Sequence, residues 1–332
     1  MPLPSSGQIS FSQLAAELGN ACSNVGLRAY SACANLASPD AITELYGKTC
    51  TPTFGAGTWS AGGAMITGRF ILAGAGTQNE SLASGGLTNV AVSCTEEYNG
   101  TSWSAGGSLI TARYAPAGAG TQNAGLVAGG YVAPSTVSCT EEYNGTSWSA
   151  GGALATARYS LVGAGTQNEG LVAGGYANDY PGVSCTEEYN GTSWSTGGAL
   201  ITVRFRFAGA GTQNVGLVAG GNNGTISFSC TEEYNGTSWS TGGALITVRY
   251  GLAGAGTQNV GLVAAGTTGT SVSCTEEYNG TSWSAGGALI TGRGYSGGAG
   301  TQNAGLVAGG YSNALVSCTE EYTKSVTSIC LA

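Results

Sequence analysis

The chain repeats itself about every 45 residues, and this period restricts what it can fold into. Six tryptophans mark the period, with successive spacings of 44, 45, 46, 45 and 44 residues: Trp59, Trp103, Trp148, Trp194, Trp239 and Trp283. One whole unit runs from GLVAGG at Gly125 through VSCTEEYNGTSWS and AGGALATAR to GAGTQN, and the next begins at Gly170. A fixed period of this length is typical of architectures in which each repeat forms one supersecondary unit.

Each unit predicts four short antiparallel strands. In the segment VSCTEEY, alternate residues such as Cys139 and Tyr143 fall on one face of a strand. Asn144-Gly145 then predicts a tight hairpin turn, and Trp148 lies in the partner strand. The apolar LVAGG run and the glycine-rich segment that ends in TQN supply the other two strands. Four short strands per unit are typical of a β-propeller blade.

The unit resembles the kelch repeat. It has that family's double glycine after an apolar strand, followed by a tyrosine and a tryptophan, as in Gly129-Gly130, Tyr143 and Trp148. The family's arginine after the fourth strand is matched by Arg113, Arg158, Arg204, Arg249 and Arg293. The chain departs from the pattern at Asn144, where the family often has aspartate, and at Ala265, which replaces a glycine. The resemblance covers residues 50–322 and implies a kelch-like propeller.

The distribution of the motifs predicts how the ring closes. Thr58-Trp59-Ser60 comes before any complete unit, whereas the last unit has SCTEEY at 317–322 but no tryptophan after it. The N-terminal strand should therefore complete the C-terminal blade and remove the open sheet edges. We predict an all-β fold in which residues 50–332 form a six-bladed kelch-like propeller closed by an N-terminal strand.

Residues 1–49 lie outside the repeat and predict two short helices. Ser10 and Gln13 can form a capping box for the first helix, and the second begins near Pro39 and ends at Gly47. Helices this short need a partner surface. The side chains expected to be buried against that partner are Phe11, Leu14, Leu18, Ile42, Leu45 and Tyr46. The opening residues have no basic region followed by an apolar run, so no signal peptide is expected.

This segment resembles the N-terminal module of tailed-bacteriophage virion proteins. The resemblance rests on the phrase LPSSGQIS at 3–10 and the phrase ITELYGK at 42–48. It implies a tail- or fibre-type structural protein that is assembled in the host cytoplasm and located in the virion. It also implies that residues 1–49 attach to other virion proteins and that the protein forms an oligomer. The alternative is an ordinary N-terminal segment that packs on the propeller.

The composition excludes most catalytic chemistry. The chain has no histidine, which excludes Ser-His-Asp mechanisms and histidine-ligated metal sites. Its net charge of −8 is opposite to that of a protein that binds nucleic acid, and no apolar run is long enough to span a membrane. We therefore expect no enzyme activity, no cofactor, no bound metal, no nucleic-acid partner and no membrane insertion.

The repeated polar residues are interpreted as structural. Equivalent cysteines of neighbouring blades should lie too far apart for a disulfide and should act as small buried apolar residues. The paired glutamates, such as Glu141-Glu142, point to opposite faces of a strand, so one pair cannot flank a sugar bond as in a glycosidase. One glutamate of each pair should meet the arginine of its blade, which leaves the other in solvent.

Differences between the repeats gather at one face of the predicted propeller. The GAGTQN and NGTS turns scarcely vary, whereas the loops after the second strand and the segments that lead into the first strand do. The variable positions are rich in tyrosine and asparagine, which suit glycan or protein recognition. The predicted ligand-binding residues are Tyr131, Asp179, Tyr180, Phe205, Arg206, Phe207, Asn222, Asn223 and Tyr311, with those from 179 to 223 in one sector.

Two functions remain open on this reading. The first is recognition of the host surface, above all of glycan, by an adhesin-like propeller. The second is a purely structural tail, neck or capsid-associated component whose propeller contacts other virion proteins, so that the variable loops reflect drift alone. Binding to soluble glycans would favour the first function, and a propeller face buried in the particle would favour the second.

Overall fold

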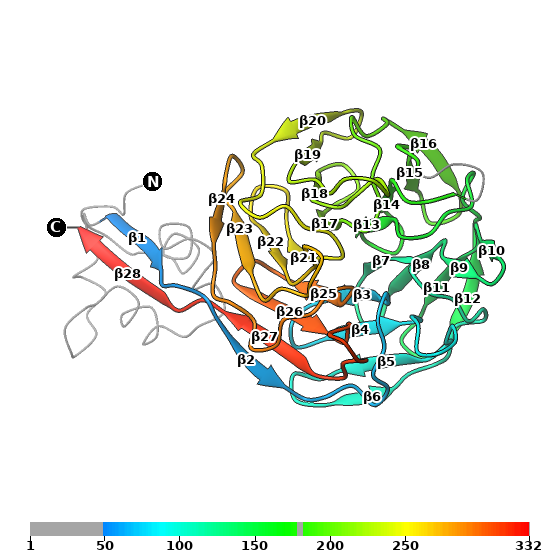
Figure 1. Ribbon diagram of the computed structural model, residues 1–332, viewed down its shortest axis with the longest axis horizontal. Coiled ribbons are helices and arrows are strands. Elements are labelled where there is room, and N and C mark those ends of the chain that lie inside the picture. The colour runs from blue at the N-terminus through cyan, green and yellow to red at the C-terminus, as the bar shows by residue number, and fades with distance from the viewer. Residues whose placement is uncertain (1–48, 178–181, 332) are drawn as a thin grey trace, which may run out of the picture. The chain divides into compact units, whose positions relative to one another are not determined.

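The computed structural model describes residues 49–177 and 182–331, whose strands are labelled in Figure 1. Every regular element in these two ranges is a β-strand, in agreement with the predicted all-β class. The two helices predicted within residues 1–49, and the six side chains expected to mediate attachment, lie outside the described residues.

Residues Thr58–Thr323 form a propeller of six four-stranded antiparallel sheets (Figure 1). Listed from the inside outward, the first blade contains β3 (Ala73–Gly76), β4 (Ser81–Ser84), β5 (Thr95–Tyr98) and β6 (Trp103–Ala105). The second contains β7 (Ala117–Gly120), β8 (Gly125–Ala128), β11 (Thr140–Tyr143) and β12 (Trp148–Gly151). The third contains β13 (Val162–Gly165), β14 (Gly170–Ala173), β15 (Thr186–Tyr189) and β16 (Trp194–Gly197). The next two contain β17 (Ala208–Gly211), β18 (Gly216–Ala219), β19 (Thr231–Tyr234) and β20 (Trp239–Gly242); and β21 (Ala253–Gly256), β22 (Gly261–Ala264), β23 (Thr275–Tyr278) and β24 (Trp283–Ala285).

The sixth blade combines strands from both ends of the propeller. It contains β25 (Gly297–Gly300), β26 (Ala304–Ala308), β27 (Thr319–Thr323) and, as its outermost strand, β2 (Thr58–Gly62). Trp59 lies opposite Tyr322 in the β2–β27 pair. The predicted closure of the ring by the N-terminal tryptophan strand is therefore confirmed.

Two further antiparallel pairs accompany the blades. Strands β9 (Tyr131–Val132) and β10 (Ser135–Thr136) form a small hairpin in the loop that follows β8. Strands β1 (Thr49–Phe54) and β28 (Val326–Leu331) pair with each other in a second compact unit, separate from the propeller.

The innermost strands carry small residues because they approach one another closely around the propeller axis. A Cβ atom added to Gly74 would lie 2.5 Å from the carbonyl oxygen of Gly298 in the preceding blade. One added to Gly298 would lie 2.6 Å from the carbonyl oxygen of Gly254. The larger side chains occupy the wider outer part of each blade, where the rings of Tyr98 and Trp103 are 4.9 Å apart. The alternation AGAG in the sequence is thus a consequence of the radial taper.

A buried ion pair holds each blade to the segment that leads into it. The carboxylate of Glu320, for example, lies 2.8 Å from the guanidinium of Arg293, and it also accepts backbone N–H groups of Ile290 and Thr291 at 2.6 and 3.1 Å. These additional hydrogen bonds to the carboxylate are what make a buried pair tolerable. The six pairs are Arg69–Glu96, Arg113–Glu141, Arg158–Glu187, Arg204–Glu232, Arg249–Glu276 and Arg293–Glu320. The predicted pairing of one glutamate with the blade's arginine is confirmed.

The second glutamate of each pair is not left in solvent, and that part of the prediction is wrong. Glu97 accepts a hydrogen bond of 2.5 Å from the Tyr143 hydroxyl of the next blade. The same contact recurs at all six blade interfaces. The reason is that a propeller sheet packs against a neighbour on each side, so both faces of the strand point into the protein.

Two more side chains donate hydrogen bonds across each interface in the same direction. The indole nitrogen of Trp148 donates to the hydroxyl of Thr95 at 2.9 Å. The side-chain amide of Gln122 donates to the carbonyl oxygens of Ser81 and Tyr98 at 3.1 and 2.7 Å. Equivalent bonds are present at the other five interfaces. The glutamine of the repeated TQN turn therefore joins adjacent blades.

The repeated cysteines are free, as predicted, but they are half-buried rather than buried: Cys94, Cys139, Cys185, Cys230, Cys274 and Cys318. The sulfur atoms of Cys185, Cys274 and Cys318 lie beside the arginines of their blades, as in the 3.3 Å contact between Cys274 Sγ and Arg249. Burial raises the pKa of the Cys94 thiol above its ordinary value, so this thiol stays protonated at neutral pH.

The closing strand can be tested by deletion. Removal of residues 50–60 should leave β27 with an exposed edge and Thr275 without the 2.9 Å hydrogen bond from Trp59. We expect the shortened protein to aggregate, as measured by size-exclusion chromatography. Trp59→Phe, which keeps the strand but lacks the indole N–H, should elute as the unaltered protein does. A deletion variant that elutes in the same way and unfolds cooperatively would contradict the role of β2.

The interface tyrosines predict how stability changes at alkaline pH. Burial, together with the hydrogen bond to Glu321, raises the pKa of Tyr98 to about 12, from about 10 in an unfolded chain. A raised pKa stabilises the fold below pH ~10, and the contribution is lost as the pH rises through about 12. We therefore expect the urea midpoint to be constant from pH ~7 to ~9 and to fall above pH ~10. The Tyr98→Phe variant should be less stable at neutral pH, and its urea midpoint should fall less steeply with pH than that of the unaltered protein. The same slope in both proteins would refute this account.

Candidate functional site

The two sets of variable segments meet at one face of the propeller. In each blade, the segment that leads into the innermost strand pairs with the loop after the second strand, as Tyr114 does with Tyr131 and Phe205 with Asn222. Phe205 and Asn222 exchange backbone hydrogen bonds of 2.9 and 3.0 Å. The repeated turns after the first and third strands lie at the opposite ends of those strands. The segments that differ between the blades therefore gather around one mouth of the axial channel.

The mouth is encircled by a closed ring of backbone hydrogen bonds. One residue from each blade donates its N–H to the carbonyl oxygen of the equivalent residue in the preceding blade, at 2.7 to 3.0 Å. All six have a left-handed backbone, with φ between 47° and 66°. We call them the mouth ring: Ile71, Ala115, Ser160, Arg206, Gly251 and Tyr295. Because only the backbone closes this ring, its side chains differ freely from blade to blade.

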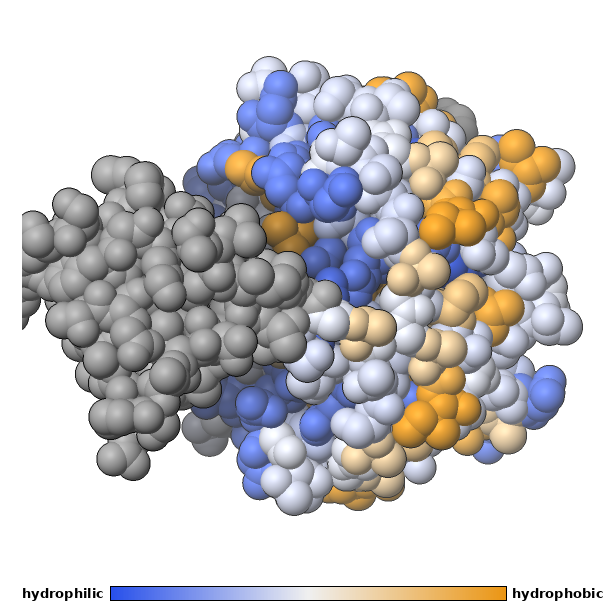
Figure 2. All heavy atoms as spheres, turned by 90° about the vertical axis from the view of Figure 1, so that its left-hand side faces the viewer, coloured by the Kyte–Doolittle hydropathy of each residue, from blue (hydrophilic) through white to orange (hydrophobic). Residues whose placement is uncertain are grey.

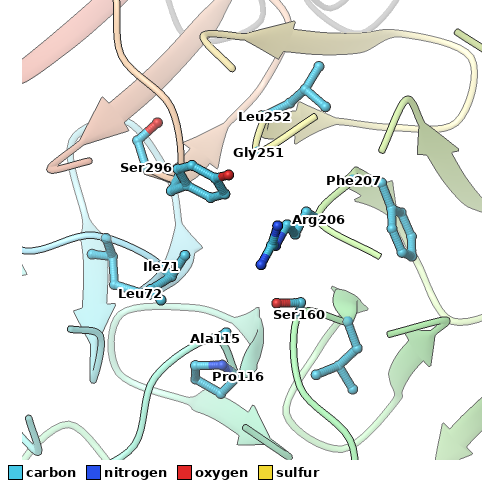
Figure 3. Close-up of a pocket in the computed structure, with 12 residues that line it drawn as sticks. Ile71, Leu72, Ala115, Pro116, Ser160, Arg206, Phe207, Gly251, Leu252 and Ser296 are labelled. Atoms are coloured by element: carbon cyan, nitrogen blue, oxygen red, sulfur yellow. The ribbon is translucent and has the colours of Figure 1, made fainter. Parts of the chain in front are cut away.

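A hollow of about 460 Å³ lies at this mouth, and we call it the mouth basin. Its lining is Phe70, Ile71, Tyr114, Tyr159, Ser160, Arg206, Tyr295 and Tyr311. A smaller space of about 90 Å³ lies beneath it and shares the mouth ring, while its floor is formed by residues such as Leu72, Leu161 and Phe207. Figure 3 shows the guanidinium of Arg206 and the hydroxyl of Ser160 both turned toward the middle of the ring. The basin volume is in the usual range for small-ligand sites.

Aromatic side chains surround the basin in two arcs. One contains Tyr114, Tyr131, Tyr159, Tyr176 and Phe205, with neighbouring ring centroids 5.1 to 5.4 Å apart. The other contains Tyr311, Phe70, Tyr295 and Tyr250, at 5.5 to 6.3 Å. Arg206 connects the arcs, because its guanidinium lies 5.4 Å from the Phe205 ring and 5.8 Å from the Tyr295 ring. The basin thus combines apolar ring faces with one cationic group.

Three tyrosines of the basin are held in the neutral form, in which the hydroxyl is a hydrogen-bond donor. Burial raises the pKa of Tyr114, Tyr159 and Tyr295, and the nearby charge of Arg206 opposes this rise only in part for the last two. Among the residues that the structure describes, no carboxylate lines the basin. The site consequently offers hydroxyl groups and a positive charge without any negative charge from its lining.

The predicted ligand-binding residues have different positions in this arrangement. Tyr311 is 41% exposed and lines the basin, and Tyr131 is half-buried in the first aromatic arc. Phe205, Phe207 and Asn222 are at most 9% exposed, and Phe207 lies beneath the mouth ring. Asn223 accepts N–H groups of Thr225 and Ile226 in its own turn. Asp179 and Tyr180 lie outside the described residues.

Four aromatic residues of the basin were not among the predicted set: Phe70, Tyr114, Tyr159 and Tyr295. A local signal marks them, since the first three each follow a repeated arginine directly and Tyr295 lies two residues after Arg293. The buried arginine fixes the path of the segment, and the next residues then reach the mouth.

Other kinds of site were sought in the same ranges. No group of histidine, cysteine or acidic side chains among the described residues could hold a metal ion. No helix in the described part of the chain has the length and apolar character that a membrane crossing needs.

The mouth ring predicts an unusual substitution result at Ile71. A β-branched residue at φ 47° is strained, by roughly 1–2 kcal/mol relative to glycine, and Gly251 already occupies the equivalent position. Ile71→Gly should therefore change the free energy of unfolding by less than about 1 kcal/mol, because relief of strain offsets the entropy of glycine. Leu72→Ala, at the adjacent buried position, should lower it by about 2–5 kcal/mol. If urea unfolding showed a similar decrease in the free energy of unfolding for both variants, the ring would not be strained.

Comparison with known proteins bears on the fold. No family model matches the chain, and no curated protein does. The solved structure of YjhT is similar over 80% of this chain and 99% of its own, with a TM-score of 0.66 and 13% sequence identity. At that identity the likeness concerns the fold alone, and it supports a β-propeller.

Proposed function

We propose that this chain is a non-enzymatic bacteriophage virion protein of the tail or fibre type, whose propeller recognises a host-surface glycan at the mouth basin. The observation that carries the proposal is the contrast between the two faces. The hydrogen bonds that build the blades are repeated six times, whereas the six residues of the mouth ring, four of which line the basin, are all different. A purely mechanical propeller has no need of such a lining.

The chemistry of the basin suits a sugar. The C–H faces of a pyranose ring stack on aromatic side chains, and its hydroxyl groups exchange hydrogen bonds with phenols, serine and arginine. The basin offers Tyr114, Tyr159 and Tyr311 for the first purpose and Ser160 and Arg206 for the second. Because the mouth ring fixes these residues on a closed scaffold, little ordering is required when a ligand binds.

The virion assignment rests on the sequence. The LPSSGQIS and ITELYGK phrases of residues 3–10 and 42–48 resemble the N-terminal module of tailed-phage proteins, and the repeat resembles the kelch family. In this proposal the N-terminal segment attaches the protein to other virion proteins, the assembled form is oligomeric, and the propeller faces the host surface.

One observation favours the alternative, a structural component whose propeller contacts other virion proteins. Isoleucines at one repeated position are 60 to 65% exposed in five blades: Ile66, Ile110, Ile201, Ile246 and Ile290. Figure 2 shows hydrophobic residues spaced along one side of the propeller. Exposed apolar residues that recur in this way are typical of protein contacts.

Binding to arrayed glycans tests the proposal. The full-length protein should bind a subset of microbial surface glycans, and the double variant Tyr131→Ala/Tyr311→Ala should weaken that binding at least about tenfold, because it removes two ring faces. The matched control is Glu80→Ala/Glu169→Ala, which changes two exposed residues in turns of the opposite face. Circular dichroism would confirm that both variants fold. Binding that survives the tyrosine substitutions would exclude the basin, and failure to bind any glycan would favour the structural alternative.

A further inference from the structure

Arg206 differs from the other arginines that the structure describes. Those six are fully buried, and each forms an ion pair with a glutamate of its blade. Arg206 is half-buried at the mouth, forms no ion pair with any described residue, and has no side-chain hydrogen bond in the same ranges. Its guanidinium lies over the faces of the Phe205 and Tyr295 rings. Its guanidinium donors are therefore available to a ligand.

The fold does not require a cation at this position. The equivalent residues of the mouth ring in the other blades are isoleucine, alanine, serine, glycine and tyrosine, and all of them make the same backbone hydrogen bond. An arginine held between two rings gives up part of its side-chain entropy of about 2 kcal/mol, against which an exposed cation–ring contact contributes only about 0.5–1 kcal/mol. The left-handed backbone at Arg206, with φ 58°, directs this side chain toward the middle of the ring (Figure 3). The fold therefore determines where the Arg206 side chain lies, but it does not require that the residue there be charged.

We propose that the mouth basin binds the carboxylate of an acidic sugar, with Arg206 as its counter-ion and one ligand for each propeller. This inference rests on the proposed function and adds the chemical class and the stoichiometry of its ligand. A planar guanidinium matches a carboxylate through two parallel N–H···O bonds. The Ser160 hydroxyl, at the neighbouring ring position, supplies a further donor on the same side. The apolar faces of Phe70 and Tyr295 then meet the carbon skeleton of the sugar.

The charge distribution favours a ligand with widely spaced negative charges. The basin holds a single cation, and the chain as a whole has a net charge of −8. A dense polyanion such as nucleic acid needs several cations along its path and would be repelled by the rest of the molecule. One carboxylate carried on a ring fits one guanidinium bordered by aromatic side chains. Because six equivalent positions supply only one cation, the expected stoichiometry is one ligand per chain.

Calorimetry with defined oligosaccharides tests the inference. The probes are an oligogalacturonate, its methyl ester and a sulfated galactan oligomer, each titrated into the full-length protein. We expect one acidic ligand per chain, binding at least about tenfold weaker for the ester, and affinity that falls as salt is added. Arg206→Gln should weaken binding of the acid about tenfold to a hundredfold and binding of the ester, which keeps only hydroxyl contacts with Arg206, by a much smaller factor. Arg206→Lys should recover only part of the affinity, because lysine cannot form the paired hydrogen bonds.

The outcomes separate this inference from the proposed function. If the acid and the ester bound equally well, and Arg206→Gln changed neither affinity, the role of the charge would be overturned. Recognition of sugars at the basin would still stand. Tighter binding of the sulfated probe would overturn the assignment to a carboxylate. No binding by any probe or arrayed glycan would overturn both proposals. The comparison of acid with ester uses the unmodified protein, so the test holds even if Arg206→Gln does not fold; Glu169→Ala serves as the folded control.

Discussion

Six strands must pack around one axis, and the space between them admits little more than backbone. Gly74, Gly254 and Gly298 approach their neighbours so closely that an added Cβ would lie 2.5 to 2.6 Å from a carbonyl oxygen. Side chains can therefore contribute to stability only farther out, where the blades diverge. That is where the buried arginine–glutamate pairs and the tyrosine–tryptophan contacts lie. The glycine-rich composition and the low number of charged residues both follow from this radial division.

Four repeated donors of each blade point toward the preceding blade, although a backbone N–H such as that of Gly107 donates the other way, to the Tyr143 hydroxyl of the next blade. The tyrosine hydroxyl, the tryptophan indole, the glutamine amide and the mouth-ring N–H of each blade donate to the preceding blade. A chain of donors and acceptors with one direction is complete only when it closes on itself, so the sixth blade needs Trp59 from the N-terminal strand to donate to Thr275. The closing strand therefore supplies both a sheet edge and the missing donor. The same closure holds the mouth of the channel in a fixed shape.

The sequence predicted the features that repeat within one blade. Strand alternation, the Asn-Gly turn, the incomplete last unit and the paired charges were enough for the six-bladed ring, its closure and the ion pair of Glu320 with Arg293. Contacts between blades were not predictable in this way. Strand alternation shows that Glu97 faces away from Arg69, but not that Tyr143 of another blade is there. The burial of Phe207 beneath the ring was likewise decided by the left-handed turn at Arg206, which no local pattern reveals.

The mouth ring explains how a nearly symmetric scaffold can carry an asymmetric site. Its hydrogen bonds use backbone atoms only, so residues as different as Ile71, Ser160 and Arg206 occupy equivalent positions without disturbing the ring. A residue on the axis is also near all six blades, and a single charge there acts on whatever enters the basin. Under the proposed function, a change of ligand would require substitutions at the ring and its aromatic neighbours but none in the blades. The left-handed backbone recurs at every position of the ring, at a cost that is smallest for Gly251 and largest for Ile71, and the ring's hydrogen bonds leave all six side chains available for other contacts.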